Sequence, residues 1–169
     1  LSTPFSRAAV DRLIKFKVKA FKIGSGECNN YPLINYIASY RKPVILSTGM
    51  NDLKSIKKAI NILKKNKTKY AILHTTNLYP TPHKLIRLNA LVEIKKKFPR
   101  TVYGLSDHTG DNYTSFAAVA MGASIIEKHF IDKSSRKGPD ITASVNSNQM
   151  KDLLKGVKLI HFAKPGGIK

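Results

Sequence analysis

The chain has 169 residues, with 30 Lys or Arg against 10 Asp or Glu, so its formal net charge is +20 at pH 7. Hydrophobic residues make up 42% of the chain. That share is enough for a buried core and excludes a disordered or collagen-like chain. Cys28 is the single cysteine, which excludes a disulfide scaffold, and no apolar run is long enough for a membrane-spanning helix.

The charge excess raises the question of a nucleic-acid partner. The lysines concentrate in segments such as 54–69 and 95–97, where they alternate with apolar residues at helical spacing. This pattern is typical of a solvated helix face. Lys outnumbers Arg by 24 to 6, whereas base recognition favours Arg. We therefore predict a lysine-rich surface and no nucleic-acid partner; a basic module that binds nucleic acid or an anionic surface is the alternative.

Short apolar runs alternate with longer amphipathic runs along the chain. In chain order, the predicted strands and helices are strand 20–23, helix 30–39, strand 43–46, helix 52–65, strand 70–74, helix 85–97, strand 102–105, helix 112–121, strand 124–127 and helix 148–162. The strands are almost wholly apolar, as in a parallel sheet covered on both faces. Strand followed by helix, repeated, predicts an α/β fold.

The strand spacing fits both an open doubly wound sheet and a (β/α)8 barrel of the TIM type. A complete barrel needs at least about 200 residues. The chain would therefore hold only the C-terminal five or so βα units of a barrel. Residues 1–5 resemble the end of a strand, and 163–167 break the last helix. We expect a piece of a longer protein, with 1–163 in the barrel domain and 164–169 starting a linker.

Each predicted strand runs directly into polar residues. These segments are 22–30, 47–50, 74–82, 104–109 and 127–130, the last followed by 138–140. Ligands of α/β proteins bind at the carboxyl ends of the strands. Polar residues at the carboxyl ends of successive strands predict one shared active site.

His108 and His129 fall at the ends of consecutive predicted strands. Two neutral imidazoles there can share a divalent ion, with water and substrate oxygens completing its coordination. The alternative is that each is a hydrogen-bonded structural residue. His74 is predicted to be structural or to support the site from behind, and His83 and His161 to lie on the surface.

Small donors also follow the strands. They are Thr3, Lys22, Ser25, Ser47, Asn77 and Ser106. Hydroxyls, an amide and an ammonium that converge make a phosphate or carboxylate site; alternatively, such residues cap the helices that follow. The Gly-Ser-Gly at 24–26 lacks the third glycine of a dinucleotide-binding loop.

The chain resembles the sialic acid synthase family, which includes N-acetylneuraminate and legionaminic acid synthases. The matching segments, in family order, are 2–6, 22–30, 46–50, 79–82, 104–109, 127–130 and 138–140. The resemblance implies an enzyme that joins phosphoenolpyruvate to an N-acetylmannosamine-type sugar aldehyde. The products would be phosphate and a nine-carbon 2-keto acid, neuraminate or legionaminate.

The resemblance also implies roles for individual residues. His108 and His129 would bind the metal, Mn2+ first, with Mg2+ or Co2+ as alternatives. Glu27 would orient or deprotonate the attacking water, and the six small donors would hold phosphoenolpyruvate. Tyr79 and Asp140 would contact the sugar hydroxyls, although Asp140 could instead cap a turn.

The N-terminal strands of the family, and its C-terminal antifreeze-like domain with an arginine that reaches the partner subunit, have no counterpart in the chain. The resemblance implies a cytoplasmic homodimer for the full-length protein. We expect the 169-residue chain alone to be inactive.

Overall fold

The computed structural model describes residues 1–133 and 135–165. The chain divides into two compact units, Leu1–Leu73 and His74–Lys169, here called the N-terminal and C-terminal units. Within the described residues, no helix combines the length and the apolar character that crossing a membrane requires.

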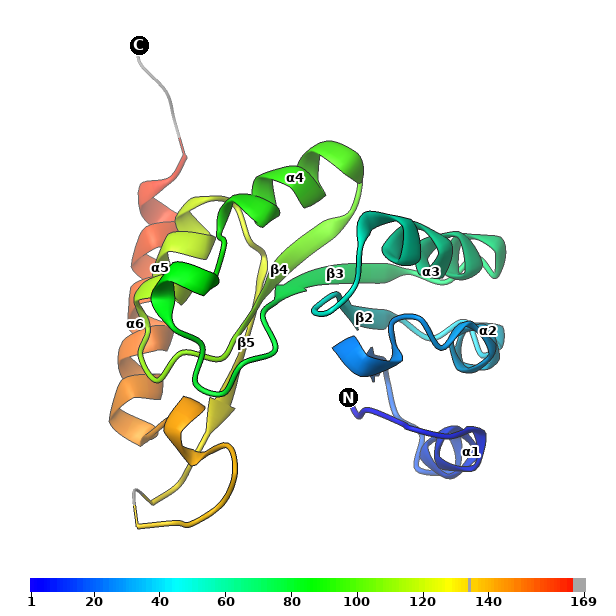
Figure 1. The fold of residues 1–169 in the computed structure, drawn as a ribbon, viewed down its shortest axis with the longest axis horizontal. Coiled ribbons are helices and arrows are strands. Elements are labelled where there is room, and N and C mark those ends of the chain that lie inside the picture. The colour runs from blue at the N-terminus through cyan, green and yellow to red at the C-terminus, as the bar shows by residue number, and fades with distance from the viewer. Residues whose placement is uncertain (134, 166–169) are drawn as a thin grey trace. The chain divides into compact units, whose positions relative to one another are not determined.

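The N-terminal unit consists of parallel strands with helices packed along them (Figure 1). Its elements are α1 (Arg7–Lys15), β1 (Phe21–Ile23), the 3-10 helix η1 (Ser25–Glu27), α2 (Tyr31–Ser39), β2 (Val44–Ser47), α3 (Leu53–Lys65) and the start of β3 (Tyr70–Thr75). In the ladder, Phe21 lies opposite Val44, and Val44 lies opposite Tyr70. Ser2 forms an isolated parallel bridge with Phe21, as the predicted strand end at residues 1–5 requires.

Helix α3 shows how the lysine-rich sequence folds. Asp52 caps it by accepting a hydrogen bond from the backbone N–H of Ser55 at 2.7 Å. Its apolar residues Ile56, Ala59, Ile60 and Leu63 are buried, whereas its lysines are exposed. The predicted solvated face is therefore confirmed for this helix.

The C-terminal unit repeats the arrangement, with α5 packed along α6 (Figure 1). Its elements are the 3-10 helix η2 (His83–Leu85), α4 (Asn89–Lys97), β4 (Val102–Asp107), α5 (Tyr113–Ala120), β5 (Ile125–Phe130), the 3-10 helix η3 (Ile141–Ala143), β6 (Ser144–Val145) and α6 (Ser147–Ala163). Strand β5 pairs in parallel with β4 and with β6. A Cβ atom on Gly104 would overlap the carbonyl oxygen of Ile125, so only glycine fits at that point of β4.

The structure confirms the predicted α/β class with parallel strands, and it alters some boundaries. Strands β4 and β5 continue to Asp107 and Phe130, because their polar residues remain in the ladder. The helix predicted over 85–97 begins only at Asn89, since Arg87 has a left-handed backbone with φ of 53°. Helix α1 and strand β6 were not predicted.

The last helix ends at Ala163, one residue beyond its predicted end. The predicted linker, 164–169, lies mostly outside the described residues. The domain boundary therefore stays a prediction.

Candidate active site

The predicted site residues are divided between the two units. Thr3, Lys22, Ser25, Glu27 and Ser47 belong to the N-terminal unit, and Asn77, Tyr79, Ser106, His108, His129 and Asp140 to the C-terminal unit. Most of them lie at or soon after the carboxyl ends of strands, whereas Lys22 lies within β1, Thr3 follows the isolated bridge at Ser2, and Asp140 lies in the loop after β5. The carboxyl ends of the strands are the position where α/β proteins bind ligands.

In the N-terminal unit, Ser25 joins the ends of β1 and β2. Its hydroxyl oxygen accepts a hydrogen bond from the backbone N–H of Gly49 at 3.1 Å. The side chain of Asn51 donates to the Ser25 carbonyl at 2.9 Å. Ser25 is buried, and so is Lys22 on β1. The contacts therefore fix the position of Ser25, and both side chains are shielded from solvent.

Ser47 is the last residue of β2 and only 2% exposed. Its hydroxyl has no hydrogen-bond partner within the part of the chain that the structure describes, whereas that of neighbouring Thr48 donates to the Leu73 carbonyl at 2.9 Å. A buried polar atom without a partner is costly and calls for an explanation. A bound ligand would supply the missing partner.

Glu27 ends the 3-10 helix η1, directly after β1. Its carboxylate accepts a hydrogen bond from the side-chain amide of Asn30 at 2.7 Å. Asn30 in turn caps α2 by accepting from the backbone N–H of Leu33. Helix α2 therefore fixes the direction of the Glu27 carboxylate.

The alternative role of the six small donors was to cap helices. In the described helices, the N-cap positions of α1, α2, α3 and α5 are instead held by Ser6, Asn30, Asp52 and Asn112. Leu88 holds that of α4 and Asn146 that of α6, so none of the six is an N-cap residue.

His108 follows β4 directly and is buried. Its Nδ1 lies 2.8 Å from the carbonyl oxygen of Thr76, an acceptor, so Nδ1 carries the proton and Nε2 presents a lone pair. Burial, together with the nearby His129, lowers the pKa of His108 below its usual range. At neutral pH the imidazole is therefore neutral, the state that binds a metal ion.

Two aromatic rings, those of Tyr79 and His129, lie against His108. The Tyr79 ring stacks on His108 with centroids 4.2 Å apart, and the His129 ring lies at 5.2 Å. The Tyr79 ring also meets His129 edge-on at 5.4 Å. Asp140 is half exposed, with its carboxylate 3.7 Å from Nδ1 of His129. The structure thus brings four predicted site residues of this unit together.

Ser106 connects the site to a residue that the sequence analysis did not assign to it. The Ser106 hydroxyl donates to the Glu127 carboxylate at 2.7 Å and lies 3.2 Å from Nε2 of His108. Glu127 and His129 are two residues apart on β5, so they share one face of the strand. That period of two is the signal that could have identified Glu127.

Two other features of the unit bear on predictions. The Asn77 side-chain oxygen is buried and has no partner among the described residues. His74 is buried, with Nε2 2.6 Å from the Ile86 carbonyl, which fits the structural alternative. His83 and His161 are exposed, as predicted, and His83 pairs with Asp111 at 2.8 Å.

The residues at the site are chemically suitable ligands for the predicted metal ion. Across residues 1–133 and 135–165, no group of three or more His, Cys, Asp or Glu side chains could hold one. In the predicted site His108 and His129 bind the ion as a pair, which leaves positions open to water and substrate. The Thr76 contact, which leaves the His108 lone pair on Nε2, is the arrangement typical of a metal-binding histidine.

The parallel strands, and the polar side chains that follow strands in each unit, place the chain among the α/β proteins, whose ligands bind at the carboxyl ends of the strands. The chain belongs to the NeuB family, whose model matches residues 1–169. This confirms the resemblance to sialic acid synthases.

Individual relatives agree. The chain is 43% identical to N,N'-diacetyllegionaminic acid synthase of Campylobacter jejuni, over 100% of the chain and 51% of that protein. It is 32% identical to human N-acetylneuraminate-9-phosphate synthase, over 92% of the chain and 43% of that protein. The chain thus spans about half the length of the curated relatives it matches.

A solved structure shares the fold over nearly the whole chain. It is N-acetylneuraminic acid (sialic acid) synthetase of Leptospira borgpetersenii, in complex with citrate. The TM-score is 0.94 at 30% identity, covering 99% of this chain and 59% of that one.

Proposed function

We propose that the protein carrying this chain condenses phosphoenolpyruvate with an N-acetylmannosamine-type sugar aldehyde. A carbon–carbon bond forms between the enol carbon and the aldehyde carbon, water adds to C2 of phosphoenolpyruvate, and phosphate leaves. The product is a nine-carbon 2-keto acid of the neuraminate or legionaminate type. The observation that carries the proposal is the pair His108 and His129 beside Asp140, with the Thr76 contact leaving the His108 lone pair on Nε2.

His108 and His129 would hold the divalent ion, for which Mn2+ is the first choice and Mg2+ or Co2+ are alternatives. Such an ion supplies Lewis-acid polarisation of the aldehyde carbonyl when it is bound. The lowered pKa of His108 keeps its lone pair available at neutral pH. Tyr79 and Asp140 lie beside the histidines and would contact the sugar hydroxyls.

The six donors named in the sequence analysis would hold the phosphate and carboxylate of phosphoenolpyruvate. They are Thr3, Lys22, Ser25, Ser47, Asn77 and Ser106. The unpartnered Ser47 hydroxyl and Asn77 amide oxygen support a polar ligand at these strand ends. Glu27, whose carboxylate Asn30 holds in place, would orient or deprotonate the attacking water.

The whole protein is proposed to complete a (β/α)8 barrel, of which this chain supplies about five βα units. We further propose a cytoplasmic homodimer that acts on small molecules and not on nucleic acid. The 169-residue chain by itself would be inactive, because an incomplete barrel leaves open sheet edges.

The test is phosphate release by the protein expressed from its natural gene. Phosphate should appear only when phosphoenolpyruvate, an N-acetylmannosamine-type sugar and Mn2+ are all present, and a chelator should stop it. Ser47→Ala should raise the KM for phosphoenolpyruvate without lowering the melting temperature, since the lost hydroxyl has no partner in the fold. Ser39→Ala is the matched control, because the exposed Ser39 hydroxyl donates only to the Tyr36 carbonyl. Metal-independent release, or none with any such sugar, would contradict the proposal.

A further inference from the structure

A buried ion pair lies directly behind the candidate site. Asp107 ends β4, and Lys128 lies opposite it on β5 in the parallel ladder. The Lys128 ammonium is 3.1 Å from the Asp107 carboxylate, and their side chains are 2% and 0% exposed. Because successive side chains of a strand alternate between its faces, this pair faces away from the site that His129 faces.

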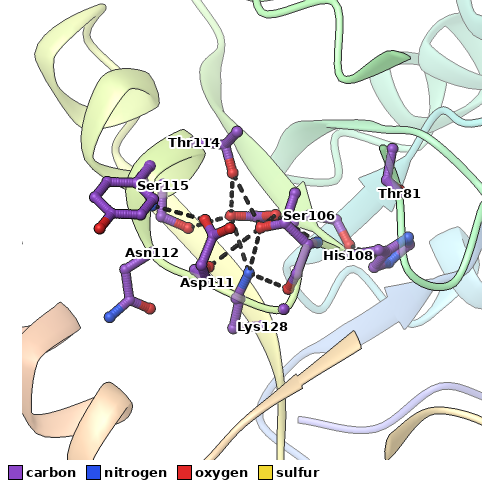
Figure 2. Close-up of polar contacts among 12 residues, drawn as sticks. Thr81, Ser106, His108, Asp111, Asn112, Thr114, Ser115 and Lys128 are labelled. Atoms are coloured by element: carbon purple, nitrogen blue, oxygen red, sulfur yellow. Dashed lines mark hydrogen bonds and ion pairs between the residues drawn. The ribbon is translucent and has the colours of Figure 1, made fainter. Parts of the chain in front are cut away.

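The Asp107 carboxylate is surrounded by donors. It accepts hydrogen bonds from the backbone N–H and hydroxyl of Thr109 at 2.9 and 2.7 Å. The hydroxyls of Thr114 and Ser115 on α5 each donate to it at 2.6 Å (Figure 2). Each carboxylate oxygen therefore receives at least two contacts, and helix α5 is tied to the end of β4.

The Lys128 ammonium has three N–H donors and three acceptors. Besides Asp107, it donates to the carbonyl oxygen of Thr109 at 2.6 Å and to the Thr109 hydroxyl at 2.9 Å. The side chain of Lys128 thus binds the chain on both sides of His108, through Asp107 before it and Thr109 after it.

Stability alone does not account for such a pair. The free-energy cost of removing two charges from water often exceeds the gain from their attraction. Replacing a buried ion pair with apolar residues is therefore frequently neutral or stabilising. A buried, fully hydrogen-bonded pair does impose one geometry on the residues next to it. Those residues are His108, which follows Asp107, and Glu127 and His129, which flank Lys128.

We propose that Asp107 and Lys128 are positioning residues, which fix His108 and His129 relative to each other so that both imidazoles bind one divalent ion. This inference rests on the proposed function, in which the two histidines hold the metal. Neither member of the pair touches the metal or the substrate.

The experiment measures Mn2+ affinity directly, from the electron paramagnetic resonance signal of free Mn2+, with the protein expressed from its natural gene. The Asp107→Asn, Lys128→Met double variant removes both charges, so no unpaired charge stays buried. Thr109→Val is a milder variant, which removes only the hydroxyl that bridges the pair. Lys164→Met is the matched control, since Lys164 donates to the Val119 carbonyl at 2.9 Å, in the contact between α5 and α6.

The double variant should unfold cooperatively and bind Mn2+ about 10–100-fold more weakly, the usual effect of losing the support of a metal ligand. Thr109→Val should show a smaller loss, and Lys164→Met none. A folded double variant with the affinity of the parent would overturn the inference. If the double variant does not fold, the Mn2+ affinity of Thr109→Val tests the inference instead. An affinity equal to that of the parent would then overturn the inference.

A His108→Ala, His129→Ala protein separates this inference from the proposed function. If it binds Mn2+ as the parent does, or if the parent binds none, the proposed metal site itself fails. If the histidines are required but the pair variants bind normally, only the positioning role fails.

Discussion

The ring of Tyr79 stacks on the imidazole of His108, with centroids 4.2 Å apart and planes inclined by 24°. The contact covers one face of His108, and the Tyr79 side chain itself is partly exposed. A single residue thus stacks on a predicted metal ligand and, under the proposed function, would also contact a sugar hydroxyl.

Two replacements of Tyr79 should separate these roles. Tyr79→Phe keeps the stacked ring and should raise only the KM for the sugar. The increase should correspond to the loss of one hydrogen bond, roughly 0.5–1.5 kcal/mol. Tyr79→Ala should also weaken Mn2+ binding, because His108 loses a neighbour worth about 0.5–1.5 kcal/mol. Steady-state kinetics and a Mn2+ titration measure the two effects. Unchanged sugar kinetics in Tyr79→Phe would remove the hydroxyl from the sugar site.

Replacing either His108 or His129 with Ala should abolish metal-dependent turnover and leave the far-UV circular dichroism unchanged. The reason is that one imidazole alone leaves the ion with too few protein ligands. His161→Ala, at an exposed position on α6, is the control and should behave as the parent. Turnover that persists in chelator after both replacements would refute the metal site.

Asp140→Asn should raise the KM for the sugar, because the charge-assisted hydrogen bonds to its hydroxyls weaken by roughly 1–3 kcal/mol. The KM for phosphoenolpyruvate should barely change. If the contact tightens in the transition state, kcat falls instead. Asp132→Asn is the matched control, since its carboxylate pairs with Arg136 in the same loop. Loss of phosphoenolpyruvate affinity with normal sugar kinetics would show that Asp140 is misplaced.

Acid should destabilise the fold through His74. Burial lowers the pKa of His74 below its usual range and outweighs the hydrogen bond to Ile86. The unfolded chain titrates near pH 6.5, while folded His74 takes up its proton only at lower pH. The free energy of unfolding should therefore decrease as pH falls through about 6.5, by about 1.4 kcal/mol per unit of pKa difference at most.

His74→Gln keeps an N–H donor for the Ile86 carbonyl and removes the titrating group. Urea unfolding at about pH 7.5 and 5.5, either side of the ordinary histidine pKa, should show a smaller pH effect in the variant. His108, whose pKa is also lowered, acts with the same sign in both proteins and cancels in the comparison. An identical pH effect in parent and variant would contradict the assignment.

Gly104→Ala should destabilise the C-terminal unit by about 1–3 kcal/mol or more, the range of overpacking in a core. The new Cβ would overlap a backbone atom, the Ile125 oxygen, which cannot turn away as a side chain can. Gly138→Ala is the control, since its Cβ would have an ordinary contact with Ile141 at 3.8 Å. Thermal unfolding measures both, and a parent-like Gly104→Ala would show that β4 and β5 can separate locally.

The sequence by itself determined the elements whose local pattern is strong. Helix α3 was predictable because four buried apolar residues recur at helical spacing between exposed lysines. The apolar strands were predictable for the same reason, and so was the position of polar segments at their ends. Helix α1 was missed although Val10, Leu13 and Ile14 recur at helical spacing between its charged residues; of the three, only Val10 is buried. The two-residue β6 is too short to leave any pattern.

Only the tertiary structure decided which polar atoms meet. The contact of His108 with the Thr76 carbonyl joins residues 32 apart, and that of Ser106 with Glu127 joins residues 21 apart. The same holds for the unpartnered Ser47 hydroxyl and for the pair Asp107 and Lys128. Local periodicity fixes the face on which a side chain lies, whereas these contacts depend on the register between strands and on helix packing. Register is set by burying whole strand faces at once, so no short segment of sequence contains it.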